Sequence, residues 1–255
     1  MKSAFLTLLV FLLLQGLGSV LLLAVGMDVT FISFVLMAAD VLAVLCCWLL
    51  LHNIRFAAAF DTSSVRWLPG LLAIGGGIMG SLSISILADK IKLPDEVLQL
   101  SLQMSHNVWG LMTLVLVGPL SEELIFREGI IGGMLRGGSK PWVAIIVSAL
   151  AFSAMHFNLA QGFYAFPLGV IFGIIYYKTG NVVLTSLLHI LNNAIAAFQI
   201  RATSEDFADF SYAEWFGSAA TAYTLMVVFG ILCVLLMYVF WRRYVPCEKS
   251  TPNAF

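Results

Sequence analysis

Charged residues are scarce in this sequence: Asp, Glu, Lys and Arg make up 11% of its 255 residues. A soluble domain carries about a quarter of such residues. Hydrophobic residues make up 61% of the chain, and its mean hydropathy is +0.99. The apolar runs are roughly 20 residues long, the length that a helix needs to cross about 30 Å of hydrocarbon. The composition therefore predicts an integral membrane protein rather than a soluble one.

Three further absences argue against particular classes of protein. Alternating polar and apolar segments of about ten residues are missing, which argues against a transmembrane β-barrel. The net charge is −1, so no basic or acidic excess suggests a nucleic-acid partner. The four cysteines form no CxxC pattern, and three of them (Cys46, Cys47 and Cys233) lie in apolar runs, so we expect neither a disulfide framework nor a cysteine metal site.

The apolar runs predict an all-α, polytopic membrane helix bundle with about eight transmembrane helices. Their expected ranges are 4–25, 30–51, 67–88, 107–126, 141–157, 163–177, 181–200 and 215–241. The first run is too long for the apolar core of a signal peptide, so we interpret it as a retained span. Gly180, in the stretch "KTGN", is expected to end the sixth span as a helix C-cap.

The cationic residues predict the orientation of the bundle. With the N-terminus in the cytoplasm, ten Lys and Arg residues lie in inner segments and three in outer ones. The inner ones are Lys2, Arg55, Arg66, Arg127, Arg136, Lys140, Lys178, Arg242, Arg243 and Lys249, and the outer ones are Lys90, Lys92 and Arg201. This asymmetry obeys the positive-inside rule and predicts cytoplasmic termini. We expect three parts: three N-terminal spans (1–100), a four-span core (101–200), and an outer loop, last span and cytoplasmic tail (201–255).

The stretch "GPLSEELIFREGIIGG" (118–133) places two carboxylates and a guanidinium inside an apolar run. Ionisable residues within a membrane are costly and usually mark a functional site. Glu123 and Arg127 are four residues apart, so they can pair on one helix face. Glu122 lies about 100° away around the helix and is left available for chemistry.

Two later spans carry polar residues with the same spacing. His156 follows Phe152 by four residues in "FSAMH", and Asn193 follows His189 by four in "HILNN". If the three helices converge, a carboxylate can take a proton from water, and an amide can stabilise an oxyanion. Glu122, His156 and His189 could also bind zinc with one position open for water. From spacing alone, catalysis and an ion or transport site both stay open.

The three segments resemble the motifs EExxxR, FxxxH and HxxxN of the CPBP family of intramembrane proteases, also called the Abi or CAAX-protease family. The resemblance covers about residues 107–200. It implies a catalytic set of Glu122, His156, His189 and Asn193, in which Glu122 activates water with help from His156. His189 and Asn193 would stabilise the oxyanion or help to bind a metal.

The same resemblance assigns supporting roles to Glu123, Arg127 and Phe152. It implies an intramembrane endopeptidase, of the metalloprotease or the glutamate type, with a divalent metal such as zinc as a cofactor in the first case only. The expected partners are the lipid bilayer and a peptide or protein substrate, which in this family can be lipidated. The compact chain is more typical of bacterial relatives, so we expect a bacterial plasma membrane.

The alternatives are a non-catalytic membrane regulator or immunity protein, and an ion transporter built on the same bundle. One geometric difficulty accompanies the catalytic interpretation. His156 lies about 23 Å from the inner end of its span and His189 about 12 Å from the inner end of its own, at the α-helical rise. The two imidazoles can meet only if these spans are tilted or displaced.

Overall fold

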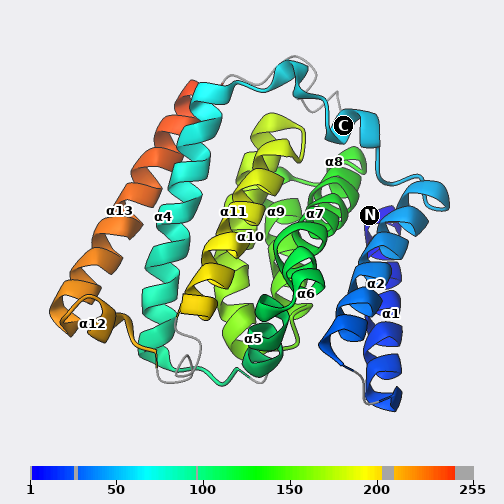
Figure 1. Cartoon of the computed structure of the whole chain (residues 1–255). Helices are drawn as coiled ribbons and strands as arrows, with labels where there is room; N and C mark the ends of the chain where they lie inside the picture. The colour runs from blue at the N-terminus through cyan, green and yellow to red at the C-terminus, as the bar shows by residue number, and fades with distance from the viewer. Residues whose placement is uncertain (1, 26–27, 96, 203–209, 245–255) are drawn as a thin grey trace.

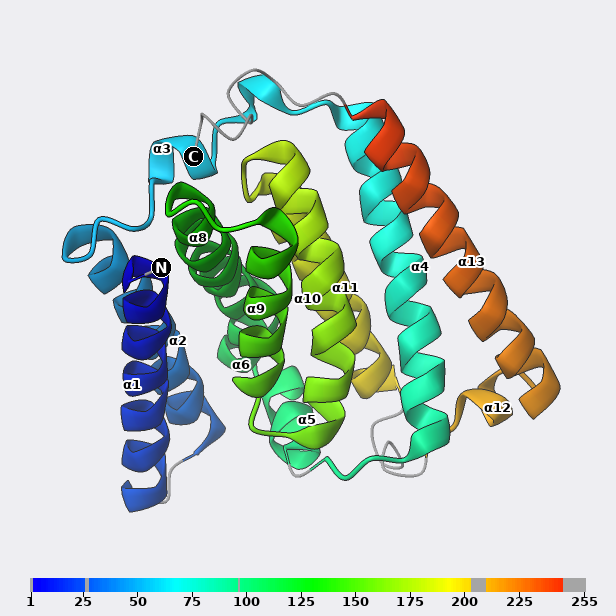
Figure 2. The ribbon, with the colours of Figure 1, turned by 180° about the vertical axis from the view of Figure 1, so that it is seen from behind.

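The computed structural model is an all-α bundle (Figure 1), and it describes residues 2–25, 28–95, 97–202 and 210–244. These ranges contain no strand. The pair α1 and α2 forms one side of the bundle and the pair α4 and α13 the other, with the remaining long helices between them (Figures 1 and 2). The division into three parts stays a prediction. The acidic outer loop within it falls largely on 203–209, and the tail on 245–255, both outside the described residues.

The helices before the core are α1 (Lys2–Val25), α2 (Val29–Leu49), α3 (Phe56–Ala59), a 3-10 turn (Thr62–Ser64), α4 (Trp67–Ile91) and α5 (Leu98–His106). One continuous helical span follows, made of α6 (Val108–Met112), a π-helical segment (Thr113–Val117), α7 (Gly118–Glu123), a second π-helical segment (Leu124–Gly132) and α8 (Gly133–Arg136). The rest are α9 (Pro141–Ala154), α10 (Leu159–Thr179), α11 (Val183–Ala202), α12 (Tyr212–Trp215) and α13 (Ala219–Arg243).

Six of these helices are long and apolar enough to cross a membrane. They are Val29–Leu49, Trp67–Ile91, Val108–Arg136, Leu159–Thr179, Val183–Ala202 and Ala219–Arg243. The apolar helices Lys2–Gly18 and Pro141–Ala154 are shorter, so the expected total of eight spans is not confirmed. Figure 1 shows α1 beginning and α13 ending at the same end of the bundle. Which membrane face this end occupies stays a prediction.

The fourth expected span, 107–126, is too short. The helical segment continues to Arg136, so Arg127 lies inside it and not in an inner loop. The helix continues because the charged residues after position 126 have partners inside the bundle, as described below. Gly180, in contrast, ends α10 as expected: its φ is 71° and its N–H donates to the Tyr176 carbonyl.

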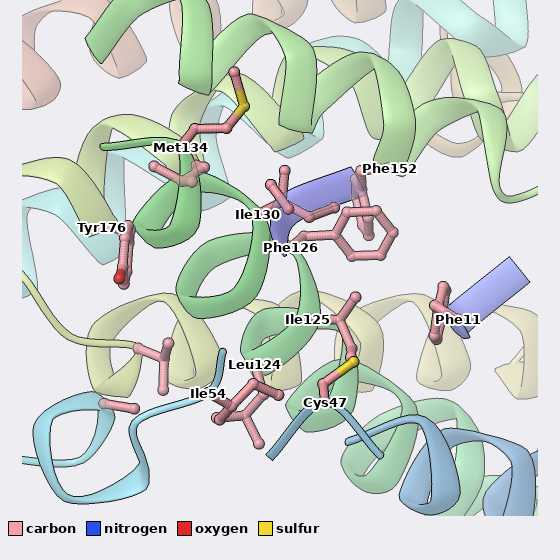
Figure 3. Packing of buried hydrophobic residues seen from close by; sticks show 14 of the residues in the cluster. Phe11, Cys47, Ile54, Leu124, Ile125, Phe126, Ile130, Met134, Phe152 and Tyr176 are labelled. Atoms are coloured by element: carbon pink, nitrogen blue, oxygen red, sulfur yellow. The ribbon is translucent and has the colours of Figure 1, made fainter. Parts of the chain in front are cut away.

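The second π-helical segment is the centre of the bundle. Every residue from Glu123 to Met134 is buried, because α1, α2, α9 and α10 all pack against this segment. Phe126 contacts Phe11 of α1 and Phe152 of α9 edge to face, with ring centroids 5.5 and 5.2 Å apart. Figure 3 shows the Phe126 and Phe152 rings side by side. Side chains on this segment therefore reach elements on all sides of it.

The glycines of α4 allow close packing of this helix against its neighbours, as the run "GGG" (75–77) suggests. A Cβ at Gly77 would overlap the Leu188 side chain of α11, whereas a Cβ at Gly75 would lie 3.7 Å from Leu236. Small residues at such contacts let membrane helices approach closely.

Gly77→Ala is expected to lower the free energy of unfolding by about 1–3 kcal/mol, the usual cost of overpacking. Gly75→Ala is the matched control and should change it by less than about 0.5 kcal/mol. Thermal denaturation of both variants in detergent measures the difference. Equal melting temperatures for the two variants would contradict the close contact between Gly77 and Leu188.

Candidate active site

The Glu123–Arg127 ion pair lies at the centre of the bundle. Arg127 Nε is 3.0 Å from Glu123 Oε2, and neither side chain is exposed. The guanidinium lies between two aromatic rings, with its central carbon 4.8 Å from the Phe152 centroid and 5.1 Å from that of Phe172. In the described part of the chain, its two terminal nitrogens have no hydrogen-bond partner. Aromatic faces therefore supply contacts that hydrogen bonds usually supply to a buried arginine.

His189 joins the two adjacent glutamates. Its Nδ1 is 2.9 Å from Glu123 Oε1, and its Nε2 is 3.6 Å from Glu122 Oε2. The Glu122 side chain keeps 25% of its surface exposed, whereas that of Glu123 is fully buried. Glu123 is thus paired with Arg127 and bonded to His189, while Glu122 has the His189 Nε2 atom at 3.6 Å. The 100° separation expected from the sequence agrees with this difference in burial and partners.

Phe152 lies between the residues of all three motifs. Its ring contacts the imidazoles of His156 and His189, with centroids 5.1 and 5.8 Å apart, and also the Arg127 guanidinium. The sequence predicts different membrane depths for His156 and His189. One aromatic side chain, Phe152, contacts both imidazoles and so spans this difference. α9 ends at Ala154, so His156 belongs to the turn before α10. Its Nδ1 is 2.9 Å from the Phe152 carbonyl oxygen, which leaves Nε2 for other contacts.

Asn193 approaches the span of Glu122 from α11. Its Nδ2 donates to the carbonyl of Leu114 at 2.9 Å. Among the described residues, it makes no hydrogen bond to Glu122, His156 or His189. The structure thus brings Asn193 against the first π-helical segment, one to two helical turns before Glu122 in the sequence.

A metal site made of Glu122, His156 and His189 does not fit the side chains as placed. Zinc needs at least three protein ligands with their donor atoms directed at one point. Within the residues that the structure describes, no three His, Cys, Asp or Glu side chains form such a group. His189 also directs Nδ1 to Glu123. We therefore derive no catalytic step through a metal.

A second buried ionic cluster lies on the same segment and was not expected from the sequence. Glu128 is fully buried, and its Oε1 is 3.0 Å from both Arg55 Nε and Arg136 Nη1. The Tyr176 hydroxyl donates to Glu128 Oε2 at 2.5 Å. One feature of the sequence could have indicated this cluster: Glu128 is a third carboxylate in the same apolar run, directly after Arg127. Arg55 and Arg136, which the sequence indicated only as loop cations, are its partners.

Asp40, to which the sequence assigned no role, is buried beside this span. Gln15 Nε2 donates to Asp40 Oδ1 at 2.6 Å. Asp40 is also close enough to Glu122 for the two charges to act on each other. Its partner on α1 explains how a lone carboxylate is accommodated in α2.

Residues 104–195 match one protein family, described as Type II CAAX prenyl endopeptidase Rce1-like. The matched range contains all three motifs and every catalytic residue expected from them. No curated protein and no solved structure matches the chain. The match supports an intramembrane endopeptidase in general. Residues 104–195 are therefore similar to CAAX-type proteases of the CPBP family, and they lie in a multi-pass membrane protein with six helices that are long and apolar enough to cross a bilayer.

Proposed function

We propose that this protein hydrolyses a peptide bond at membrane depth, with Glu122 as the general base. The observation that carries this proposal is the unequal environment of two adjacent carboxylates. Glu123 is committed to Arg127 and His189, whereas Glu122 is partly exposed and has the His189 Nε2 edge at 3.6 Å. Neighbouring carboxylates in such different surroundings are typical of catalytic sites that assign them separate roles.

The proposed reaction starts with water bound to Glu122. The carboxylate takes a proton from this water, and the oxygen attacks the carbonyl carbon of the substrate. The His189 imidazole and the second N–H of the Asn193 amide stabilise the oxyanion that forms. When the C–N bond breaks, Glu122 returns the proton to the leaving amine. Water is thus divided between the new carboxylic acid and the new amine.

His156 is proposed to help Glu122 to orient the attacking water. The bond from its Nδ1 to the Phe152 carbonyl fixes the ring and leaves Nε2 as a proton acceptor or donor. The Phe152 ring contacts this imidazole, the Arg127 guanidinium and the His189 imidazole. Its proposed role is to hold the spacing of the site.

The substrate proposed is a membrane-associated peptide or protein segment. The family description names a prenyl endopeptidase, so a lipidated C-terminal segment is one form that this substrate can take. The polypeptide termini released by the enzyme identify the form.

The test is terminal-peptide proteomics on membranes from cells that carry wild type, Glu122→Gln or Glu214→Gln at matched levels. Glu122→Gln keeps the size of the side chain but cannot accept the proton, so we expect cleavage to fall by about 10²–10⁴-fold. Glu214 is exposed on α12, and its substitution should leave the cleavage products unchanged.

Two outcomes decide whether Glu122 catalyses proteolysis. Peptide termini that are present with wild type and Glu214→Gln but lost with Glu122→Gln would establish proteolysis and identify a substrate. The same termini in all three membranes would overturn the role of Glu122. If the termini do appear, repeating the reaction after chelator treatment tests a metal-dependent mechanism separately, because a metal-independent enzyme keeps its activity.

A further inference from the structure

The Asn193 amide is held by a hydrogen bond to an unusual backbone carbonyl. In the first π-helical segment, the N–H of Gly118 donates to the carbonyl of Thr113, five residues earlier. The next carbonyl, that of Leu114, would pair in the same register with residue 119, but Pro119 has no N–H. Asn193 Nδ2 donates to this carbonyl at 2.9 Å. The proline before the two glutamates therefore creates the acceptor that binds Asn193.

The other end of the Asn193 amide is bonded to the neighbouring asparagine. Asn192 Nδ2 donates to Asn193 Oδ1 at 3.2 Å. Asn192 is buried, and its Oδ1 accepts from Ser81 Oγ of α4 at 2.5 Å and from the Tyr164 hydroxyl of α10 at 2.8 Å. The Ser81 and Tyr164 hydroxyl oxygens are also in contact, so two hydroxyl hydrogens are shared among three contacts.

This network fixes the direction of both amides. The Leu114 carbonyl can only accept, so the Asn193 amide nitrogen faces it and the Asn193 oxygen faces the Asn192 nitrogen. The Asn192 oxygen is then the atom that the Ser81 and Tyr164 hydroxyls bind. One N–H of Asn193 is used by the Leu114 carbonyl, which leaves its second N–H for another acceptor.

We propose that Tyr164 and Ser81 are positioning residues that act through Asn192 to set the orientation of the Asn193 amide. The proposal rests on the proposed function, in which Asn193 stabilises the oxyanion. Without the two hydroxyls, the Asn192 amide loses the partners that hold its oxygen, and it no longer restrains the Asn193 amide. The Asn193 amide would then be held by the Leu114 carbonyl alone, and its second N–H would lose its fixed direction. The three helices α4, α10 and α11 thus cooperate to direct one N–H group.

The first measurement does not depend on catalysis. The side-chain amide signals of Asn193 are observed by NMR in detergent-solubilised protein labelled with ¹⁵N-asparagine, and assigned with Asn193→Asp. We expect Tyr164→Phe to shift or broaden these signals. Ser83→Ala is the control, because Ser83 on the same helix as Ser81 donates to the Met226 carbonyl of α13 at 2.9 Å. Unchanged Asn193 signals in Tyr164→Phe would overturn the proposal.

The second measurement is a double-mutant cycle on cleavage, using a peptide that spans a junction found by the proteomic experiment. Tyr164→Phe should lower kcat about tenfold, the effect of roughly one hydrogen bond, with KM unchanged. In an Asn193→Ala background, the same substitution should have no further effect. An equal loss in both backgrounds would mean that Tyr164 does not act through Asn193. If Glu122→Gln still cleaves, the proposed function fails, while the NMR result stands on its own.

Discussion

Arg127→Met is expected to leave little folded protein in the membrane. The substitution removes the guanidinium that pairs with Glu123 and leaves His189 as its remaining ion-pair partner among the described residues, and both members of the Glu123–Arg127 pair are fully buried. Breaking a buried pair by removing one partner costs about 3–5 kcal/mol, because an uncompensated charge stays behind. This is a large part of the roughly 5–15 kcal/mol that stabilises a protein. The measurement is the yield and melting temperature of the detergent-extracted variant.

Two controls separate the loss of the charge pair from the loss of the side chain. Arg201→Met changes an exposed arginine at the end of α11 and should be neutral within about 0.5 kcal/mol. The double variant Glu123→Gln with Arg127→Met leaves no unpaired charge, so it should be more stable than Arg127→Met alone. A double variant that is less stable than the single one would contradict this account of the pair.

Glu128→Ala is the second substitution with a large expected effect, a loss of about 3 kcal/mol in the free energy of unfolding. Glu128 holds two guanidinium groups at 3.0 Å from the same oxygen. Without it, Arg55 and Arg136 repel each other, and the Tyr176 hydroxyl loses this acceptor. The side chains of Arg55 and Arg136 keep 38% and 21% of their surface exposed. They can therefore turn to water, which limits the loss. Chemical or thermal denaturation in detergent measures it.

Tyr176→Phe is the matched control for this cluster. It removes one hydrogen bond to Glu128 and keeps both ion pairs, so it should cost about 1 kcal/mol. If Glu128→Ala costs no more than Tyr176→Phe, the two arginines contribute nothing measurable to the cluster. The structural interpretation of Glu128 would then be wrong.

The sequence predicted the helical class and the Glu123–Arg127 pair, because both depend on local spacing. Residues four apart share a face of an α-helix, and the pair forms at 3.0 Å even though Arg127 lies in the π-helical segment. The order of the three motifs also indicated that His189 would lie near the glutamates. The catalytic roles of these residues stay predictions, since only the proposed experiments test them.

The features that the sequence did not predict depend on residues that are far apart in the sequence. Glu128 is joined to Arg55, 73 residues away, and no periodicity connects the two. The expected fourth span ends at position 126, whereas the helix continues through Arg127 and Glu128, which have partners inside the bundle. The π-helical segments alter the helical register itself, so the hydrogen bond of Asn193 to the Leu114 carbonyl could not be predicted from α-helical spacing. Pro119 was the one local signal for this change.

The burial of residues 123–134 on all sides restricts how the chain enters the lipid during synthesis. A charged residue near the centre of a lone membrane helix costs about 2.5–3.5 kcal/mol on insertion scales, and this helix carries several. The aromatic rings that cover Arg127 belong to α9 and α10, which are synthesised later, whereas Arg55 is synthesised earlier. We therefore expect this helix to settle in the bilayer only after the ribosome has completed the chain beyond Phe172, so that its insertion is a late, cooperative event in biogenesis.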